Sequence, residues 1–138
     1  MQLKQSILLA TLITLSSAAN AGLQTFNYTD EDSSVKVTSG IVKPCSGSVG
    51  VYTPKRNADG TPGVSTAKDN EITLLCKTTK DNVCTADIFS NKNCSGTKVG
   101  YASLDLTTKS VISVTSTNPK YVFVSENGGT VLKVKYAG

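Results

Sequence analysis

The sequence contains no histidine and no tryptophan. The missing histidine excludes serine–histidine and cysteine–histidine nucleophile pairs, and it excludes histidine zinc sites. Any catalysis would have to depend on carboxylates, lysine, tyrosine or serine. We therefore predict that the chain is not an enzyme and that it needs no cofactor.

Charged residues are also few, at 17% of the chain against roughly 25% in typical globular proteins. The formal net charge is +4, and the basic residues are scattered along the sequence. Nucleic-acid binding usually needs a concentrated basic face, so we expect no nucleic-acid partner. Hydrophobic residues make up 38% of the chain, which is too many for a disordered protein.

A mostly apolar run occurs near the N-terminus, in residues 7–15. Lys4 precedes this run, and small residues ending at Ala21 follow it, which is typical of a bacterial secretory signal peptide. The run is too short for a permanent membrane helix. We predict cleavage after Ala21 and a single domain, residues 22–138, that is secreted or periplasmic. No cysteine follows the cleavage site closely, so we expect no membrane anchor.

Four cysteines follow the predicted leader: Cys45, Cys76, Cys84 and Cys94. An even number in an exported chain predicts two disulfides, but spacing alone leaves the connectivity open. We favour Cys45–Cys76 with Cys84–Cys94, because residues 90–93 form a good turn that would bring Cys94 back toward its own strand. The alternative is Cys76–Cys84 with Cys45–Cys94.

Apolar and polar residues alternate with the period of a β-strand through most of the chain. Turn residues separate the segments, and many short strands at this spacing are typical of a sandwich or barrel. We predict an all-β, antiparallel β-sandwich with Greek-key or jelly-roll-like connections and eight or nine strands. A small β-barrel is the alternative. The predicted strands are Leu23–Tyr28, Val35–Val42, Ser48–Thr53, Glu71–Thr78, Val83–Phe89, Lys98–Leu106, Ser110–Thr115, Lys120–Ser125 and Thr130–Tyr136.

The last two of these strands form the clearest local motif. Asn127-Gly128 lies between them, and this pair supplies the positive φ angles that tight hairpin turns require. Leu132, Val134 and Tyr136 alternate with Lys133 and Lys135, so we predict that the first set faces the core and the lysines face solvent.

The segment Pro54–Asn70 shows no alternation and contains two prolines and two glycines. Long irregular segments in compact domains are often functional, so we predict an exposed loop that contacts a partner. Tyr52 precedes this loop, and a tyrosine beside basic residues is typical of a contact surface. The predicted binding residues are Tyr52, Lys55, Arg56, Asn57 and Asp59.

Two groups of carboxylates offer other chemistry. Asp30, Glu31 and Asp32 are weak candidate ligands for a calcium ion, although their spacing matches no known calcium loop. Asp87 interrupts an otherwise apolar strand and, with a second acid, would be the candidate for a hydrolase without histidine.

These observations predict a small secreted or periplasmic bacterial binding protein without catalytic activity. It would present loops on a disulfide-stabilised β scaffold to an extracytoplasmic protein or glycan, on the bacterial envelope or on a host cell. One alternative is an inhibitor that inserts the Lys55-Arg56 loop into an exported hydrolase. The second alternative is the carboxylate-dependent hydrolase.

Overall fold

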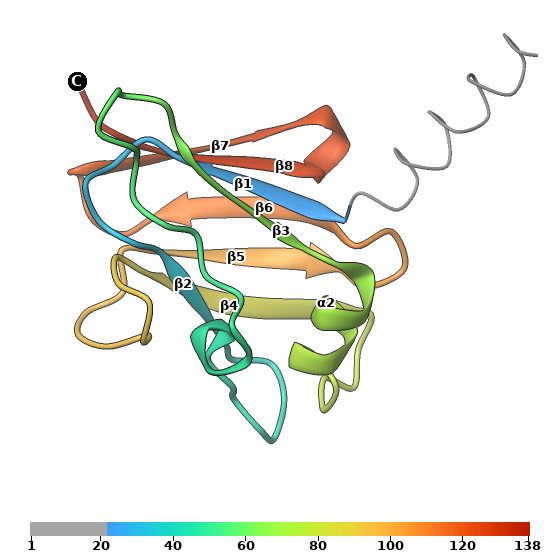
Figure 1. Cartoon of the computed structure of the whole chain (residues 1–138). Coiled ribbons are helices and arrows are strands. Elements are labelled where there is room, and N and C mark those ends of the chain that lie inside the picture. Colours follow the sequence, from blue (N-terminus) through green and yellow to red (C-terminus); the bar gives the residue numbers. More distant parts are fainter. Residues whose placement is uncertain (1–21) are drawn as a thin grey trace, which may run out of the picture.

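The computed structural model describes residues 22–138, so the predicted signal peptide lies outside the described residues. Eight strands form two four-stranded sheets that lie over one another as two layers (Figure 1). The predicted β-sandwich is confirmed. The described residues contain no helix long and apolar enough to cross a membrane. The strands are β1 Leu23–Asn27, β2 Ser34–Val37, β3 Gly63–Ala67, β4 Val83–Phe89, β5 Gly100–Asp105, β6 Ser110–Ser116, β7 Tyr121–Glu126 and β8 Val131–Tyr136.

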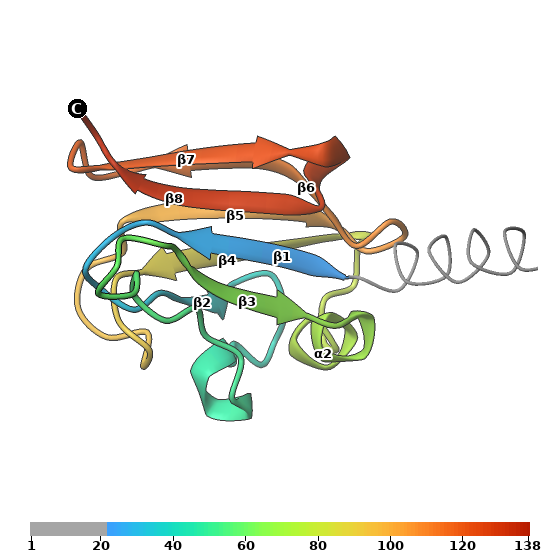
Figure 2. The same cartoon turned by 45° about the horizontal axis from the view of Figure 1, so that its top comes forward.

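The first sheet has the strand order β3-β1-β8-β7, and the second has the order β2-β4-β5-β6. Strands β1 and β8 pair in parallel, whereas the other neighbours pair antiparallel. The chain passes from β6 to β7 through residues 117–120, which joins the sheets along one side. At the other side the edge strands β2 and β3 belong to different sheets, so the barrel alternative is not closed (Figure 2).

Short helices lie at this open side of the sandwich, between the strands of the two sheets. The 3₁₀ helix η1 spans Ser46–Val49, and the α-helix α2 spans Asp69–Leu75 (Figure 1). The predicted strands Ser48–Thr53 and Glu71–Thr78 are therefore wrong. In α2, the backbone N–H of Lys68 donates to Glu71 Oε1 at 2.9 Å, and two acidic residues lie in the first turn. Both features favour a helix start.

The prediction of one long loop over Pro54–Asn70 is also wrong in part. Strand β3 lies inside it and pairs with β1 from Leu23↔Ala67 to Asn27↔Gly63. The sequence of β3 has weak strand propensity, and its backbone is held by this non-local pairing.

The hairpin between β7 and β8 is confirmed. Asn127, Gly128 and Gly129 have positive φ angles of 53°, 65° and 88°. Gly129 has a second role, since a Cβ atom there would lie 2.3 Å from the carbonyl oxygen of Val111. Leu132 and Val134 are buried as predicted.

The disulfides are Cys45–Cys94 and Cys76–Cys84, so our favoured connectivity is wrong and the alternative is right. Cys76 directly follows α2 and Cys84 lies in β4, and the short turn between them brings the two sulfurs together. Cys94 cannot reach Cys84 because the loop after β4 turns sideways toward β2. There the backbone N–H of Cys94 donates to Ser34 Oγ at 3.1 Å.

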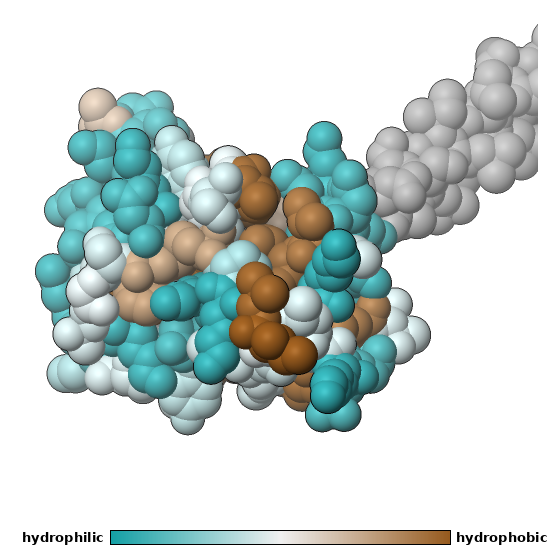
Figure 3. All heavy atoms as spheres, turned by 90° about the horizontal axis from the view of Figure 1, so that it is seen from below, coloured by the Kyte–Doolittle hydropathy of each residue, from teal (hydrophilic) through white to brown (hydrophobic). Residues whose placement is uncertain are grey.

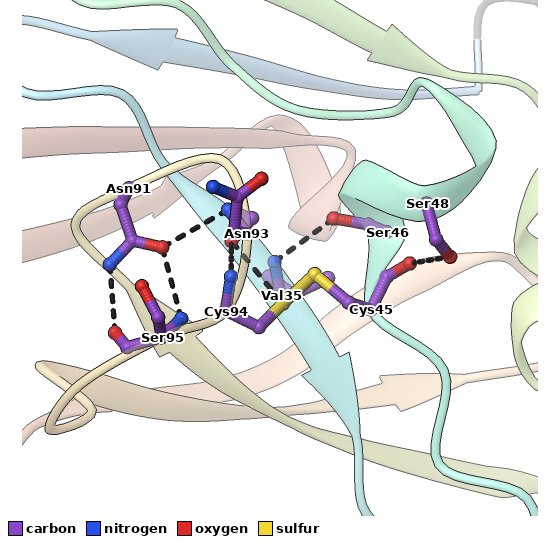
Figure 4. The surroundings of a disulfide bond; sticks show 9 residues. Val35, Cys45, Ser46, Ser48, Asn91, Asn93, Cys94 and Ser95 are labelled. Atoms are coloured by element: carbon purple, nitrogen blue, oxygen red, sulfur yellow. Dashed lines mark hydrogen bonds between the residues drawn. A yellow bond between two sulfur atoms is a disulfide. The ribbon is translucent and has the colours of Figure 1, made fainter.

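The loop that carries Cys94 is shaped by its own side chains (Figure 4). Asn91 Oδ1 accepts hydrogen bonds from the backbone N–H groups of Asn93 and Ser95, each at 3.0 Å. On the other side of the disulfide, Ser48 Oγ donates to the carbonyl oxygen of Cys45 at 2.6 Å. The bond thus connects two loops that flank β2.

Candidate functional site

The space between the two sheets is incompletely filled, and an apolar cavity of about 120 Å³ lies there. The buried apolar residues form two separate clusters, one around Leu75 and Cys84 and the other around Ile88 and Tyr121. Domains of this size usually have one contiguous core. Residues of both clusters line the cavity, which therefore separates them.

Small side chains at inward-facing positions leave this space. Ala86 of β4 lies directly opposite Ala102 of β5 in one sheet. Thr25 of β1 lies opposite Ser65 of β3 in the other sheet. All four residues line the cavity. Sandwich cores are filled by the side chains of the two inner faces, so short side chains on both inner faces leave part of the space between the sheets unfilled.

Thr53 closes part of the open side of the sandwich. Its backbone forms two hydrogen bonds of 2.8 Å with Ser33, next to β2. Its side-chain hydroxyl lies 2.6 Å from that of Ser65 in β3. Thr53 is 5% exposed and bridges the edges of both sheets.

Tyr52, the first predicted binding residue, lies beside this bridge. It lines the cavity and yet is 37% exposed. A side chain that contacts both the cavity and solvent marks the place where the cavity reaches the surface. Tyr52 is therefore accessible to a partner, and its role in binding stays a prediction.

Exposed apolar side chains lie on the same open side of the sandwich (Figure 3). The loop after β2 presents Ile41 and Val42, at 81% and 58% exposure, and α2 presents Leu74 at 54%. Val49 of η1 is also exposed. Two hydrogen bonds between the backbone of Val42 and Thr78 Oγ1 hold the loop beside the end of α2. Figure 3, which views this side, shows apolar residues gathered at its centre around a hollow. We call Ile41, Val42, Val49, Tyr52 and Leu74 the apolar face.

The basic and acidic candidates lie together and bind one another. Arg56 Nη2 forms an ion pair of 2.7 Å with Asp30 Oδ1, and the backbone N–H of Arg56 donates to the carbonyl oxygen of Thr29. The backbone N–H of Lys55 donates to Asp32 Oδ1 at 2.9 Å. These contacts fix the start of the predicted binding loop against the turn that follows β1.

The third acidic residue, Glu31, turns away from this loop, toward β7 and β8 of the same sheet. Its Oε1 accepts hydrogen bonds from the hydroxyls of Tyr121 at 2.5 Å and Tyr136 at 3.4 Å, and it lies 3.4 Å from Lys120 Nζ. The Tyr121 hydrogen bond and the Lys120 charge lower the pKa of Glu31, although partial burial opposes them. Burial raises the pKa of Tyr121.

The three neighbouring carboxylates thus contact different partners. Within residues 22–138, no group of three or more cysteine or acidic residues is arranged so that it could hold a metal ion. The candidate calcium ligands are not brought together. Asp30 and Asp32 contact the loop at Lys55 and Arg56, whereas Glu31 contacts Tyr121.

Asn57 and Asp59 stabilise the tip of their own loop. Asp59 Oδ1 accepts hydrogen bonds from the hydroxyl of Thr61 at 2.6 Å and from its backbone N–H at 3.0 Å. These two bonds lower the pKa of Asp59. Asn57 Nδ2 donates to Thr61 Oγ1 at 3.0 Å. The tip of the loop is a self-bonded turn, separate from the cavity.

Asp87 lies on the outer face of the second sheet, as alternation predicts. It forms an ion pair of 3.4 Å with Lys98, and its register partner in β5 is Tyr101. Asp105 of β5 binds the turn around it, accepting hydrogen bonds from Asn82 Nδ2 and from the backbone N–H of Thr107. The geometry does not direct these two carboxylates at a common point.

No protein-family model, curated protein or solved structure matches the chain. The argument about function therefore rests on the residues and geometry described above. Sequence reasoning named Tyr52 as a candidate, but it missed the apolar face and the cavity. Ile41 and Val42 were assigned to a strand, and Leu74 was assigned to another, so neither prediction placed them on an exposed surface.

Proposed function

We propose that the chain is an exported, non-enzymatic binding protein that contacts an extracytoplasmic partner protein through the apolar face. The two disulfides support an oxidising compartment outside the cytoplasm. The sequence supports export through the predicted signal peptide. The disulfides and the sandwich would serve as a rigid scaffold for the loops.

The observation that carries this proposal is the exposure of five apolar or aromatic side chains from three separate segments on one side of the molecule. Contiguous exposed apolar surface costs solubility, and in soluble proteins it usually marks a contact site. Tyrosine is enriched at the centres of such sites, and polar loops surround them. The loop that carries Lys55 and Arg56 would form part of this polar rim.

A comparison of matched tyrosine variants tests the proposal. The oxidised protein, Tyr52→Ser and Tyr101→Ser would each be immobilised and exposed to periplasmic and extracellular fractions. Tyr101 is a suitable control because it is 45% exposed on the outer face of the second sheet. We expect a partner that the wild type and Tyr101→Ser retain and that Tyr52→Ser loses. A partner that all three proteins retain equally, or one that depends on Tyr101, would contradict the proposed surface.

A further inference from the structure

The cavity between the sheets offers a second kind of site, inside the molecule. Its 120 Å³ is somewhat smaller than the roughly 150 Å³ of engineered apolar cavities that stay dry and bind benzene or xenon. The residues that line it include no charged side chain. A water molecule would need two to four polar partners there.

Four of the hydroxyl groups around the cavity already have partners. Thr53 and Ser65 bind each other at 2.6 Å, and Ser46 Oγ accepts a hydrogen bond from the backbone N–H of Val35 at 3.0 Å. Ser34 Oγ accepts one from the backbone N–H of Cys94. Within residues 22–138, no buried side-chain nitrogen or oxygen lacks a hydrogen-bond partner. Because the lining is predominantly apolar, a polar ligand group would lose hydrogen bonds with water that the cavity does not fully replace.

We propose that this cavity binds a small neutral apolar molecule, of about the size of benzene, which enters beside Tyr52. Its walls are the Ala86–Ala102 pair of one sheet and the Thr25–Ser65 pair of the other. Leu75 of α2 contributes a further apolar side chain to the lining. The inference goes beyond the proposed function, because the ligand lies between the sheets and the partner protein lies on the surface.

Benzene is the probe, and hydroquinone is its polar control of similar shape. Each would be titrated into the isotope-labelled, oxidised protein while amide chemical shifts are recorded by NMR. We expect benzene to cause saturable shifts centred on the amides of Thr25, Ala86 and Ala102. Hydroquinone should cause no saturable shift at these residues, because its two hydroxyls would lose their hydrogen bonds to water.

A pair of variants at neighbouring positions locates the site. Ala102→Leu fills the cavity and should weaken benzene binding at least tenfold. Ser103→Leu places the same leucine side chain on the outer face of β5 and should leave binding unchanged. Should Ala102→Leu fail to fold, Ala86→Val fills part of the same space and should also weaken binding.

The proposal is wrong if benzene causes no saturable shift in the wild type. It is equally wrong if hydroquinone binds as well as benzene, or if the filled variant binds benzene as the wild type does. Retention of a partner protein through Tyr52 is measured separately, so either proposal can fail while the other holds.

Discussion

Removal of the Cys45–Cys94 disulfide should destabilise the protein more than removal of Cys76–Cys84. The two bonds join cysteines that are 49 and 8 residues apart. In the chain-entropy model, closing loops of these lengths lowers the entropy of the unfolded chain by amounts worth about 4 and about 2.5 kcal/mol at 25 °C. The double variants Cys45→Ala/Cys94→Ala and Cys76→Ala/Cys84→Ala would measure both effects.

The free energy of unfolding of each double variant would be obtained from urea denaturation under non-reducing conditions. The free energy of unfolding of Cys45→Ala/Cys94→Ala should be lower than that of Cys76→Ala/Cys84→Ala by about 1.5 kcal/mol. The reasoning would be refuted if the free energy of unfolding falls no further in Cys45→Ala/Cys94→Ala than in Cys76→Ala/Cys84→Ala.

The same variants test the connectivity without any energy model. In our structure, Cys45→Ala/Cys94→Ala leaves the Cys76–Cys84 bond intact, so a thiol assay in denaturant should detect no free cysteine. With the connectivity that we first favoured from the sequence, the same variant would leave two unpaired thiols. Two free thiols per chain would therefore overturn the structural assignment.

Three further predictions concern single residues. Gly129→Ala should destabilise the protein by more than the roughly 1–2 kcal/mol expected for a non-glycine residue in the left-handed region, because its Cβ would also clash with the backbone of Val111. Gly128→Ala is the control, since position 128 also has a positive φ but has open space around it. Urea denaturation measures the free energy of unfolding of both variants. Ala86→Val should raise the free energy of unfolding by about 0.5–2 kcal/mol because it fills part of the cavity. A lower melting temperature than that of the wild type would mean that the space is already filled. The depressed pKa of Glu31 contributes stability that is fully present above its ordinary value of 4.5 and is lost as the pH falls through the lower folded-state pKa. Glu31→Gln should therefore be less stable than the wild type near neutral pH, and the gap should narrow in acid; a gap that is constant between pH 2 and 7 would show that the carboxylate charge contributes nothing.

Strands with strong local signals could be predicted from the sequence. Strand β4 was predicted with its correct bounds, Val83–Phe89, because its alternation is regular and turn residues flank it. The β7–β8 hairpin was predicted because Asn127-Gly128 specifies a turn through local backbone preference alone. In both cases the information lies within a few neighbouring residues.

The helix α2 was missed because it is short. Ile72, Leu75 and Cys76 have the helical i, i+3, i+4 spacing and are all buried. Leu74 lies between them and is 54% exposed, so the run resembles a continuous apolar strand. The acidic first turn, with Asp69 and Glu71, was the signal that could have identified the helix.

The cavity and the disulfide connectivity depend on which distant residues meet. Ala86, Ala102, Thr25 and Ser65 are unremarkable in the sequence, and they leave a space only because strand register places them opposite one another. In the same way, Cys94 meets Cys45 because the loop after β4 crosses toward β2. Local patterns carry no information about such pairings.

Xenon binding in a crystal tests most directly whether the two sheets leave an apolar space. The account predicts that a crystal of the oxidised protein under xenon pressure shows xenon density between the Ala86–Ala102 pair and the Thr25–Ser65 pair. Side chains that meet across this space, with no xenon between the sheets, would contradict it.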